Sequence, residues 1–315
     1  MSSSTVVVGS LSFDMVFKVS KRPLKGETVK GTSFETFVGG KGNNQALAAA
    51  RAGSSCAMIG KVGDDEYGKL LRAELIKNKV NVDGLAVDKS AGTGLANIYV
   101  DDDGDNSIVI VPRANDTLKR DDIDRVRSII EAGELILLQL EIPMETVVYT
   151  AQLAKKLGKK VLLNPAPAPD DGKIPDELFK SLDYFVPNES EAALIVGFNL
   201  DSEVAEEKAL SKLSELIDGV VLITLGDRGV IGIDNTTGER VSHPAYKVNT
   251  IDTTAAGDAF IGAFASRLVE NASLKEAVKY AAASGALATT VAGATPSLPD
   301  RRQIEALVSN ELAPR

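Results

Sequence analysis

The 315-residue sequence contains a single cysteine, Cys56, and a single histidine, His243. One cysteine excludes an internal disulfide framework, and one cysteine with one histidine excludes a Cys/His zinc site. A histidine-dependent catalytic triad would have to use His243, which we expect at the surface or at a strand edge. No stretch approaches the run of about 18 apolar residues that a membrane-spanning helix needs. The first residues also lack the basic and apolar regions of a targeting segment.

The sequence also has fewer basic than acidic residues. The 35 Lys and Arg residues against 44 Asp and Glu residues give a net charge of −9, which disfavours binding to nucleic acid or to an anionic membrane. The 44% hydrophobic and 25% charged residues are typical of a globular protein. We therefore expect a cytoplasmic protein with no nucleic-acid or membrane partner. The length allows two domains, or one large domain with a small appendage.

Apolar runs alternate with helical patterns along most of the chain. Runs that predict buried strands occur at 5–9, 55–60, 135–140, 160–164, 183–187 and 220–225. Helical spacing is found between them, at 43–52, 65–78, 144–157, 176–181, 189–196 and 203–218, and two Ala-rich helices are expected at 256–270 and 274–290. This alternation predicts an α/β fold with a mostly parallel sheet that is covered by helices on both faces.

Two segments interrupt the alternation. Residues 11–38 contain alternating strand-like pieces without a helix, and residues 92–111 indicate a hairpin around a turn at 101–104. These strands would form a small second sheet. Because such a sheet cannot bury both of its faces alone, it should cover a ligand, a partner subunit or both.

The strongest local signal is the segment 252–258, DTTAAGD, which precedes a helical pattern. The small residues Ala255, Ala256 and Gly257 allow a ligand to approach the backbone closely. Their N–H groups would lie at a helix N-terminus, where a phosphate is favoured. Asp258 would stand in the first turn and accept a proton from a substrate hydroxyl. The alternative is an acidic residue that only complements the helix dipole.

A second glycine-rich segment, 39–45 (GGKGNNQ), precedes the first predicted helix. It is not a Walker A loop, because Lys41 is followed by Gly42 rather than Ser or Thr, and it lacks the third glycine of a dinucleotide fingerprint. Its glycines still indicate a close approach to a polar ligand, and Lys41 and Asn44 offer donors for hydroxyls or phosphate. A plain turn with a helix cap is the alternative.

Two further segments follow predicted strands. Asn188 and Glu191, within PNESE (187–191), would begin a helix at the carboxyl end of a strand, where open α/β sheets place their ligands. Glu191 would hold a metal or order its waters, or else only cap the helix. The segment 224–229 (TLGDRG) suits a nucleotide lying over the backbone, although a β-turn between two strands explains it equally well.

Together these motifs resemble the ribokinase-like, or PfkB, family of sugar and nucleoside kinases, from about Val6 to Pro299. Seven motifs follow the family order: Gly9-Ser…Asp14, GGKGNNQA (39–46), GDDEYG (63–68), NPAPAP (164–169), PNESEA (187–192), TLGDRG and DTTAAGDAF (252–260). The resemblance implies a Rossmann-like core made of residues 1–10, 39–91 and 112–315, with a β-sheet lid made of residues 11–38 and 92–111. It also implies transfer of the γ-phosphoryl group of ATP to a sugar hydroxyl, for ribose the 5-hydroxyl.

The resemblance further assigns the site residues. The sugar pocket would comprise Ser12, Asp14, Gly40, Lys41, Asn44, Glu141 and the catalytic base Asp258. ATP would contact Asn188, Gly257 and the stretch from Thr224 through Gly226 to Gly229. The backbone of Ala255, Ala256, Gly257 and Asp258 would form an anion hole, and Glu191 would help to order Mg²⁺ and its waters.

A monovalent cation and a second subunit are implied as well. In ribokinases an activating K⁺ is enclosed by positions that match the side chains of Asp252 and Ser297 and the backbone carbonyls of Thr254, Ala288, Val291 and Gly293. A large, weakly hydrated cation suits such carbonyl oxygens. Here the alternative is an ordinary helix-to-loop exit, with Asp252 as a cap. Relatives often pair through the lid sheet, so a homodimer is expected.

One position departs from the family pattern. Ser12 stands where ribokinases commonly have Asn, which offers both a donor and an acceptor at longer reach. D-Ribose is therefore the expected substrate, with another pentose or a nucleoside such as adenosine as the alternative. A sugar-binding protein without activity is disfavoured by the intact Asp258. A nucleotide-dependent oxidoreductase is disfavoured by the missing glycine fingerprint.

Overall fold

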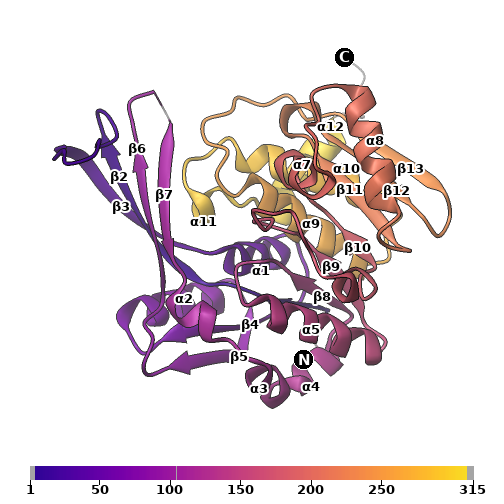
Figure 1. Ribbon diagram of the computed structural model, residues 1–315, viewed down its shortest axis with the longest axis horizontal. Helices are drawn as coiled ribbons and strands as arrows, with labels where there is room; N and C mark the ends of the chain where they lie inside the picture. Colours follow the sequence, from indigo (N-terminus) through magenta and orange to yellow (C-terminus); the bar gives the residue numbers. More distant parts are fainter. Residues whose placement is uncertain (1–3, 104, 311–315) are drawn as a thin grey trace.

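A mixed sheet of nine strands forms the centre of the protein (Figure 1). The computed structural model describes residues 4–103 and 105–310. In sheet order the strands are β13 (Glu239–His243), β12 (Val230–Asp234), β11 (Val220–Thr224), β10 (Tyr184–Phe185), β9 (Lys160–Leu163), β8 (Leu135–Leu138), β1 (Thr5–Val8), β4 (Cys56–Gly63) and β5 (Asn81–Asp88). The seven strands at one end of this order are parallel: β11, β10, β9, β8, β1, β4 and β5. β12 is antiparallel to both of its neighbours. The predicted mostly parallel sheet is confirmed.

Two layers of helices cover the faces of this sheet. Successive side chains of a strand point to opposite faces, so Val7 joins one buried cluster whereas Val6 and Val8 join the other. The first layer contains α1 (Lys41–Arg51), α2 (Glu66–Lys77), α9 (Ala256–Val269) and α10 (Leu274–Ala288), with α12 (Arg301–Asn310) packed outside α10. The second contains α3 (Arg120–Arg125), α4 (Arg127–Ala132), α5 (Met144–Lys156), α6 (Asp176–Phe179), α7 (Glu189–Val196) and α8 (Glu203–Ser214).

The small sheet has four strands in the order β3 (Gly31–Gly39), β2 (Ser12–Val19), β6 (Gly94–Val100) and β7 (Asn106–Val111). All four come from the two segments that lack helices, and Figure 1 shows them projecting away from the central sheet at the upper left. β6 and β7 pair as the expected hairpin, although Gly104 of its turn lies outside the described residues. The division of the chain into a core and a moving lid stays a prediction.

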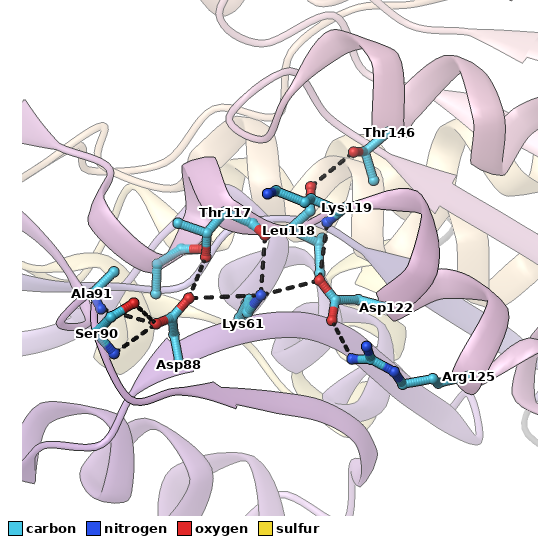
Figure 2. Close-up of polar contacts among 11 residues, drawn as sticks. Lys61, Asp88, Ser90, Ala91, Thr117, Leu118, Lys119, Asp122, Arg125 and Thr146 are labelled. Carbon is cyan, nitrogen blue, oxygen red and sulfur yellow. Dashed lines mark hydrogen bonds and ion pairs between the residues drawn. The ribbon is translucent and has the colours of Figure 1, made fainter.

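The chain segment that leads into β6 and the segment that follows β7 are both linked to Lys61, near the end of β4 (Figure 2). Lys61 Nζ donates to the carbonyl oxygen of Thr117 at 3.0 Å and to Asp122 Oδ2 at 3.1 Å, and lies 3.6 Å from Asp88 Oδ2. Asp88 Oδ1 accepts from the backbone N–H groups of Ser90 and Ala91, and its Oδ2 accepts from the Thr117 hydroxyl. The segment leading into β6 and the 3₁₀ turn after β7 (Arg113–Thr117) therefore meet at one cation.

Over the described ranges, no helix has both the length and the apolar character that a membrane crossing requires.

Candidate active site

The motif residues gather where the strand order of the central sheet reverses. From β1 the chain continues on one side into β4 and β5, whereas β8 to β11 follow on the other side. Open α/β sheets bind ligands in the crevice at such a point, beyond the carboxyl ends of the strands. Ser10 follows β1 here and Glu141 follows β8.

Glycines allow α1 to begin directly against the end of β1. A Cβ atom at Gly42 would lie 2.6 Å from the Ser10 backbone nitrogen, and Gly40 has a φ of 90°, which favours glycine. Glu141 Oε2 accepts from the Ser10 hydroxyl at 2.6 Å and from the Lys41 backbone N–H at 3.0 Å. The predicted sugar residues Gly40, Lys41 and Glu141 are therefore held together by short contacts.

Ser12 and Asp14 enter the same region from β2. The Ser12 hydroxyl donates to Asp14 Oδ1 at 2.8 Å, so its proton is already used within the pair. Burial raises the pKa of Asp14 to about 6; the hydrogen bond from Ser12 opposes this, and the charges of Glu141 and Asp258 add to it. A side chain at Gly39 would overlap the Asp14 carboxylate, since its Cβ would lie 2.1 Å from Oδ2.

Asp258 lies in the first turn of α9 and is 8% exposed. The residue before the helix, Ala255, has a left-handed φ of 60°, a conformation that is uncommon for a residue with a Cβ and is often found at functional sites. Burial raises the pKa of Asp258, against the lowering effects of Lys41 and of hydrogen bonds from Gln45 and Asn44. The pKa of Lys41 is raised, because nearby carboxylates, first Asp258, outweigh its burial.

A pocket of about 210 Å³ opens beside Asp258. It joins part of the predicted sugar and nucleotide sets, because its lining includes Lys41, Asp258, Gly257, Ala255, Asn188, Glu191 and Thr224. The other predicted sugar residues, and Gly226 and Gly229, do not line it. The N–H groups of the first helical turn have no partner within a helix. One of them, that of Ala256, donates to the Thr253 carbonyl at 3.2 Å. The pocket therefore combines a buried carboxylate, a cation and a helix N-terminus.

The predicted nucleotide side shows helix capping and a tight turn. Asn188 and Glu191 form a reciprocal capping box at the start of α7, with both bonds at 2.8 Å, as the capping interpretation expected. Burial raises the pKa of Glu191 to about 7, although the Asn188 N–H and Lys41 act against it. Gly226 and Gly229 lie in and directly after the 3₁₀ turn Gly226–Arg228 that joins antiparallel β11 and β12. The β-turn interpretation of this segment is therefore correct as local structure.

The predicted cation residues are brought together in part. Asp252 accepts from the Thr254 N–H at 2.9 Å and from the Gly293 N–H at 2.8 Å. Despite partial burial, these hydrogen bonds lower the pKa of Asp252. Ala288 ends α10, and Val291 lies exposed in the following loop. The Ser297 hydroxyl donates to the Ala294 carbonyl within α11 (Ala294–Ser297).

Three buried amides beside Asp258 were not identified from the sequence. Gln45, Gln139 and Asn164 are all below 9% exposed and hydrogen-bond to one another or to Asp258. The available signal was polarity: Gln45 opens an Ala-rich helix, and Gln139 interrupts the apolar run LILLQL. Such residues are rarely buried without a partner.

Within the described residues, no three His, Cys, Asp or Glu side chains are arranged to hold a metal ion. Glu191 lines the pocket. Mg²⁺ in phosphate-transferring sites is usually bound by one or two carboxylates with phosphates and water, so Glu191 fits an ion that arrives with a nucleotide.

Comparison with known proteins agrees with this arrangement. Residues 2–301 match the model of the pfkB family carbohydrate kinases. The chain is 37% identical to a ribokinase of Bacillus subtilis, covering 96% of this chain and 98% of the relative. It is 35% identical to a deoxyribokinase of Salmonella typhi, covering 96% and 98%. A bifunctional ribokinase/ribose-5-phosphate isomerase A of Fructilactobacillus sanfranciscensis is 36% identical, and the match spans 56% of that longer protein.

Among solved structures, the ribokinase of Arabidopsis thaliana complexed with ribose and ATP superposes with a TM-score of 0.88 at 33% identity, covering 98% of this chain and 99% of that one. The match to the family model and the full-length relatives lead to one conclusion: the chain belongs to the pfkB family of carbohydrate kinases and is a phosphotransferase that acts on an alcohol group.

Proposed function

We propose that this protein transfers the γ-phosphoryl group of ATP to the 5-hydroxyl of D-ribose, with Asp258 as the base. The observation that carries the proposal is the pocket in which Asp258, Lys41 and the start of α9 lie beside Asn188 and Thr224. The ribokinase relatives and the neighbour complexed with ribose and ATP support the choice of substrates.

In the proposed reaction, Asp258 accepts the proton of the 5-hydroxyl of ribose while the oxygen of that hydroxyl forms a bond to the γ-phosphorus. The bond between that phosphorus and the β–γ bridging oxygen breaks, and ADP leaves. Phosphoryl transfer depends mainly on alignment and charge neutralisation. The amides of residues 255–258 would hold the transferring group, and Asp14 and Glu141 would orient the sugar by accepting hydrogen bonds from its hydroxyls.

Two ions complete the proposal. Mg²⁺, held near Glu191 and by the phosphates, would supply charge neutralisation. K⁺ would be held by Asp252 and Ser297 and by the carbonyl oxygens of Thr254, Ala288, Val291 and Gly293. It would not touch the sugar. Its effect would be to fix the turn that aims the α9 amides, and the 2.8 Å bond between Asp252 and Gly293 supports this arrangement because it joins the two loops concerned.

The small sheet would act as the lid and also pair two subunits. Ser12 and Asp14 belong to β2 of this sheet, the charges of Glu141 and Asp258 act on Asp14, and the residues of β7 are exposed throughout. A lid that closes over the sugar would exclude water from the transfer. The proposed assembly is therefore a homodimer joined through the small sheets.

The experiment is an ADP-release assay with D-ribose, 2-deoxy-D-ribose and adenosine, with the product position assigned by phosphorus NMR. Ribose should be phosphorylated at C5 and adenosine should not react. Asp258→Asn should lower kcat by about 10²–10⁴-fold and leave ATP binding intact, because the amides remain. Asp121→Asn, an exposed carboxylate of α3, is the matched control and should keep wild-type turnover. Near-normal turnover of Asp258→Asn, or turnover of adenosine with none of ribose, would contradict the proposal.

A further inference from the structure

A chain of buried amide side chains contacts Asp258, and of its members Asn164 lines the pocket. It runs from Gln139, which directly follows β8, through Gln45 on α1 to Asp258 and Asn164. Gln45 and Gln139 have no exposed surface, and neither lines the pocket. Buried amides at this density cost free energy unless their groups are paired, so their arrangement calls for a physical reason.

Each oxygen of the Asp258 carboxylate accepts a hydrogen bond from an amide side chain of α1. Asn44 Nδ2 donates to Oδ2 at 3.0 Å, and Gln45 Nε2 donates to Oδ1 at 2.9 Å. Two donors on two oxygens fix the rotation of the carboxylate about its terminal bond. The remaining lone pairs of Asp258 are then presented in one direction, which is what a base needs in order to meet a hydroxyl at hydrogen-bond distance.

The orientation of the Gln45 amide is itself determined by its neighbours. Asn164 Nδ2 donates to the Val186 carbonyl at 2.9 Å, so Asn164 presents its oxygen, and Gln45 Nε2 donates to that oxygen at 2.9 Å. Gln139 Nε2 donates to Gln45 Oε1 at 2.7 Å. A flipped Gln45 would oppose acceptor to acceptor at Asn164 and at Asp258 Oδ1, so its N–H groups must face Asp258.

One oxygen in this chain of amides has no hydrogen-bond partner within the part of the protein that the structure describes. Gln139 Oε1 is buried without a hydrogen-bond partner among the described residues. A Cβ atom at Gly9 would lie 2.0 Å from it. The glycine that follows β1 therefore leaves the space that Gln139 occupies, and Gln139 uses its N–H group to pair the Gln45 oxygen.

We infer that Gln45 is a positioning residue for Asp258, held in its working orientation by Asn164, while Gln139 donates to its oxygen. The inference rests on the proposed role of Asp258 as base. Gln45 would act in two ways: it fixes the direction of the carboxylate, and its N–H favours the ionised form that accepts the proton. Lys41 and Asn44 favour the same form, whereas the charged groups Glu141, Asp14 and Glu191, which face the site from other elements, disfavour it.

The test compares wild type with Gln45→Met, which keeps the side-chain length and removes the donors. At pH 7 kcat should fall about 10–100-fold, as expected for a misplaced reacting group. KM for ATP and for ribose should change less than about threefold, since Gln45 does not line the pocket. Losing a hydrogen bond to the ionised carboxylate should also move the acid limb of the kcat–pH profile up by about one pH unit. Raising the pH should then restore part of the activity.

Thr150→Val is the control for stability, because Thr150 is buried, donates only to the Thr146 carbonyl in α5, and lies in the other helix layer. It should lower the melting temperature without moving the acid limb. If Gln45→Met does not fold, Gln139→Met carries the test, with a smaller loss of kcat and a shift of the acid limb in the same direction. A wild-type kcat and acid limb in the folded variant would overturn the inference. Inactivity of the wild type on ribose, or normal turnover of Asp258→Asn, would instead contradict the proposed function.

Discussion

At the scale of single residues, the site contains more carboxylates than its positive charge can neutralise. Glu141, Glu191 and Asp258 lie near the partly buried Lys41, and burial raises the pKa of Asp14, Glu191 and Asp258. Groups with perturbed pKa values often mark functional sites. The sugar hydroxyls and the cation–nucleotide complex that we propose as ligands would supply the donors and the positive charge that these carboxylates lack.

The buried charge of Asp14 should make the ligand-free protein less stable at high pH. Its pKa is 3.8 in the ordinary state and about 6 when folded, so its contribution to stability is greatest below pH 3.8 and is lost as the pH rises through 6. Asp14→Asn should therefore raise the free energy of unfolding at pH 8 by about 1–3 kcal/mol. The gain should disappear near pH 4, where the wild-type carboxyl is also neutral.

Urea unfolding of both proteins at pH 4.5 and pH 8, without sugar, measures this difference. Asp83→Asn, which changes an exposed carboxylate, is the control and should give the same small effect at both pH values. Because Asp14 is a proposed sugar ligand, the stabilised variant should also have a higher KM for ribose. A variant that is less stable than wild type at pH 8 would show that Asp14 is ionised at little cost.

At the scale of elements, periodicity predicted the long helices and the central strands within a few residues. Elements without a clear period were missed. β5 (NVDGLAVD) contains Gly84, at which a Cβ atom would lie 2.9 Å from the Met58 carbonyl oxygen. The glycine allows close packing against β4, but it interrupts the residue pattern from which a strand is predicted. β13 is mostly polar, and α3 and α4 have six residues each, too few to show a 3.6-residue period. α12 was likewise not predicted, although its Ile304 is fully buried.

The connections of the small sheet should depend on Lys61. Lys61→Met removes the donor to the Thr117 carbonyl and to Asp122 and leaves the little-exposed Asp88 without its cation, whereas Asp122 keeps its ion pair with Arg125. We expect the free energy of unfolding to fall by about 1–3 kcal/mol, the usual cost of leaving a buried acceptor unpaired. KM for ribose should rise, because the segments that carry β6 and β7 are loosened.

Thermal unfolding and initial rates measure both effects. The control is Lys69→Met on α2, since Lys69 pairs with Glu66 in an exposed position and such pairs contribute little. It should leave both quantities unchanged. If Lys61→Met changed stability but not KM, the Lys61 cluster would support the core without positioning the small sheet.

The proposed cation loops give a second prediction at this scale. The initial rate should rise with KCl at constant ionic strength, set with a bulky organic cation, and NaCl should be less effective, because several carbonyl oxygens suit the larger ion. Asp252→Asn should weaken this activation and leave ATP binding intact. Asp300→Asn, a neighbouring carboxylate that accepts from the Gln303 N–H, should respond to KCl like wild type. A flat response, or equal activation by both salts, would rule out the site.

At the scale of the whole molecule, the small sheet leaves the apolar strand β7 exposed. Ile108, Val109, Ile110 and Val111 are 51%, 58%, 54% and 48% exposed. They form an apolar edge strand, a feature that proteins normally cover. Residues opposite one another in the ladder share a face, so Ile110 lies on the face of Asp14, through Ala96, whereas Val109 lies on the opposite face with Met15, through Asn97.

Pairing of two copies through this sheet should therefore be sensitive to charge on β7. Val109→Lys changes the face away from Asp14 and should convert the proposed dimer to a monomer in sedimentation or light-scattering measurements. Val204→Lys makes the same change at an apolar residue of α8 that is 80% exposed, and should leave the mass unchanged. A monomeric wild type, or a dimer that survives Val109→Lys, would contradict pairing through this face.

The sequence by itself determined the central parallel strands, the long helices between them and the motif order, because periodicity and glycine placement are local properties of the chain. It also determined the family, since seven motifs in one order are far more specific than any one of them. Only the tertiary structure decided which polar residues act together. Gln45, Gln139 and Asn164 lie on α1, after β8 and after β9, and become one chain of amides only where the strand order reverses. Lys61 likewise joins Asp88 to Asp122 across the central sheet edge. Hydrogen-bond partners are determined by distance and burial in the folded chain, and neither can be predicted from the spacing of residues in the sequence.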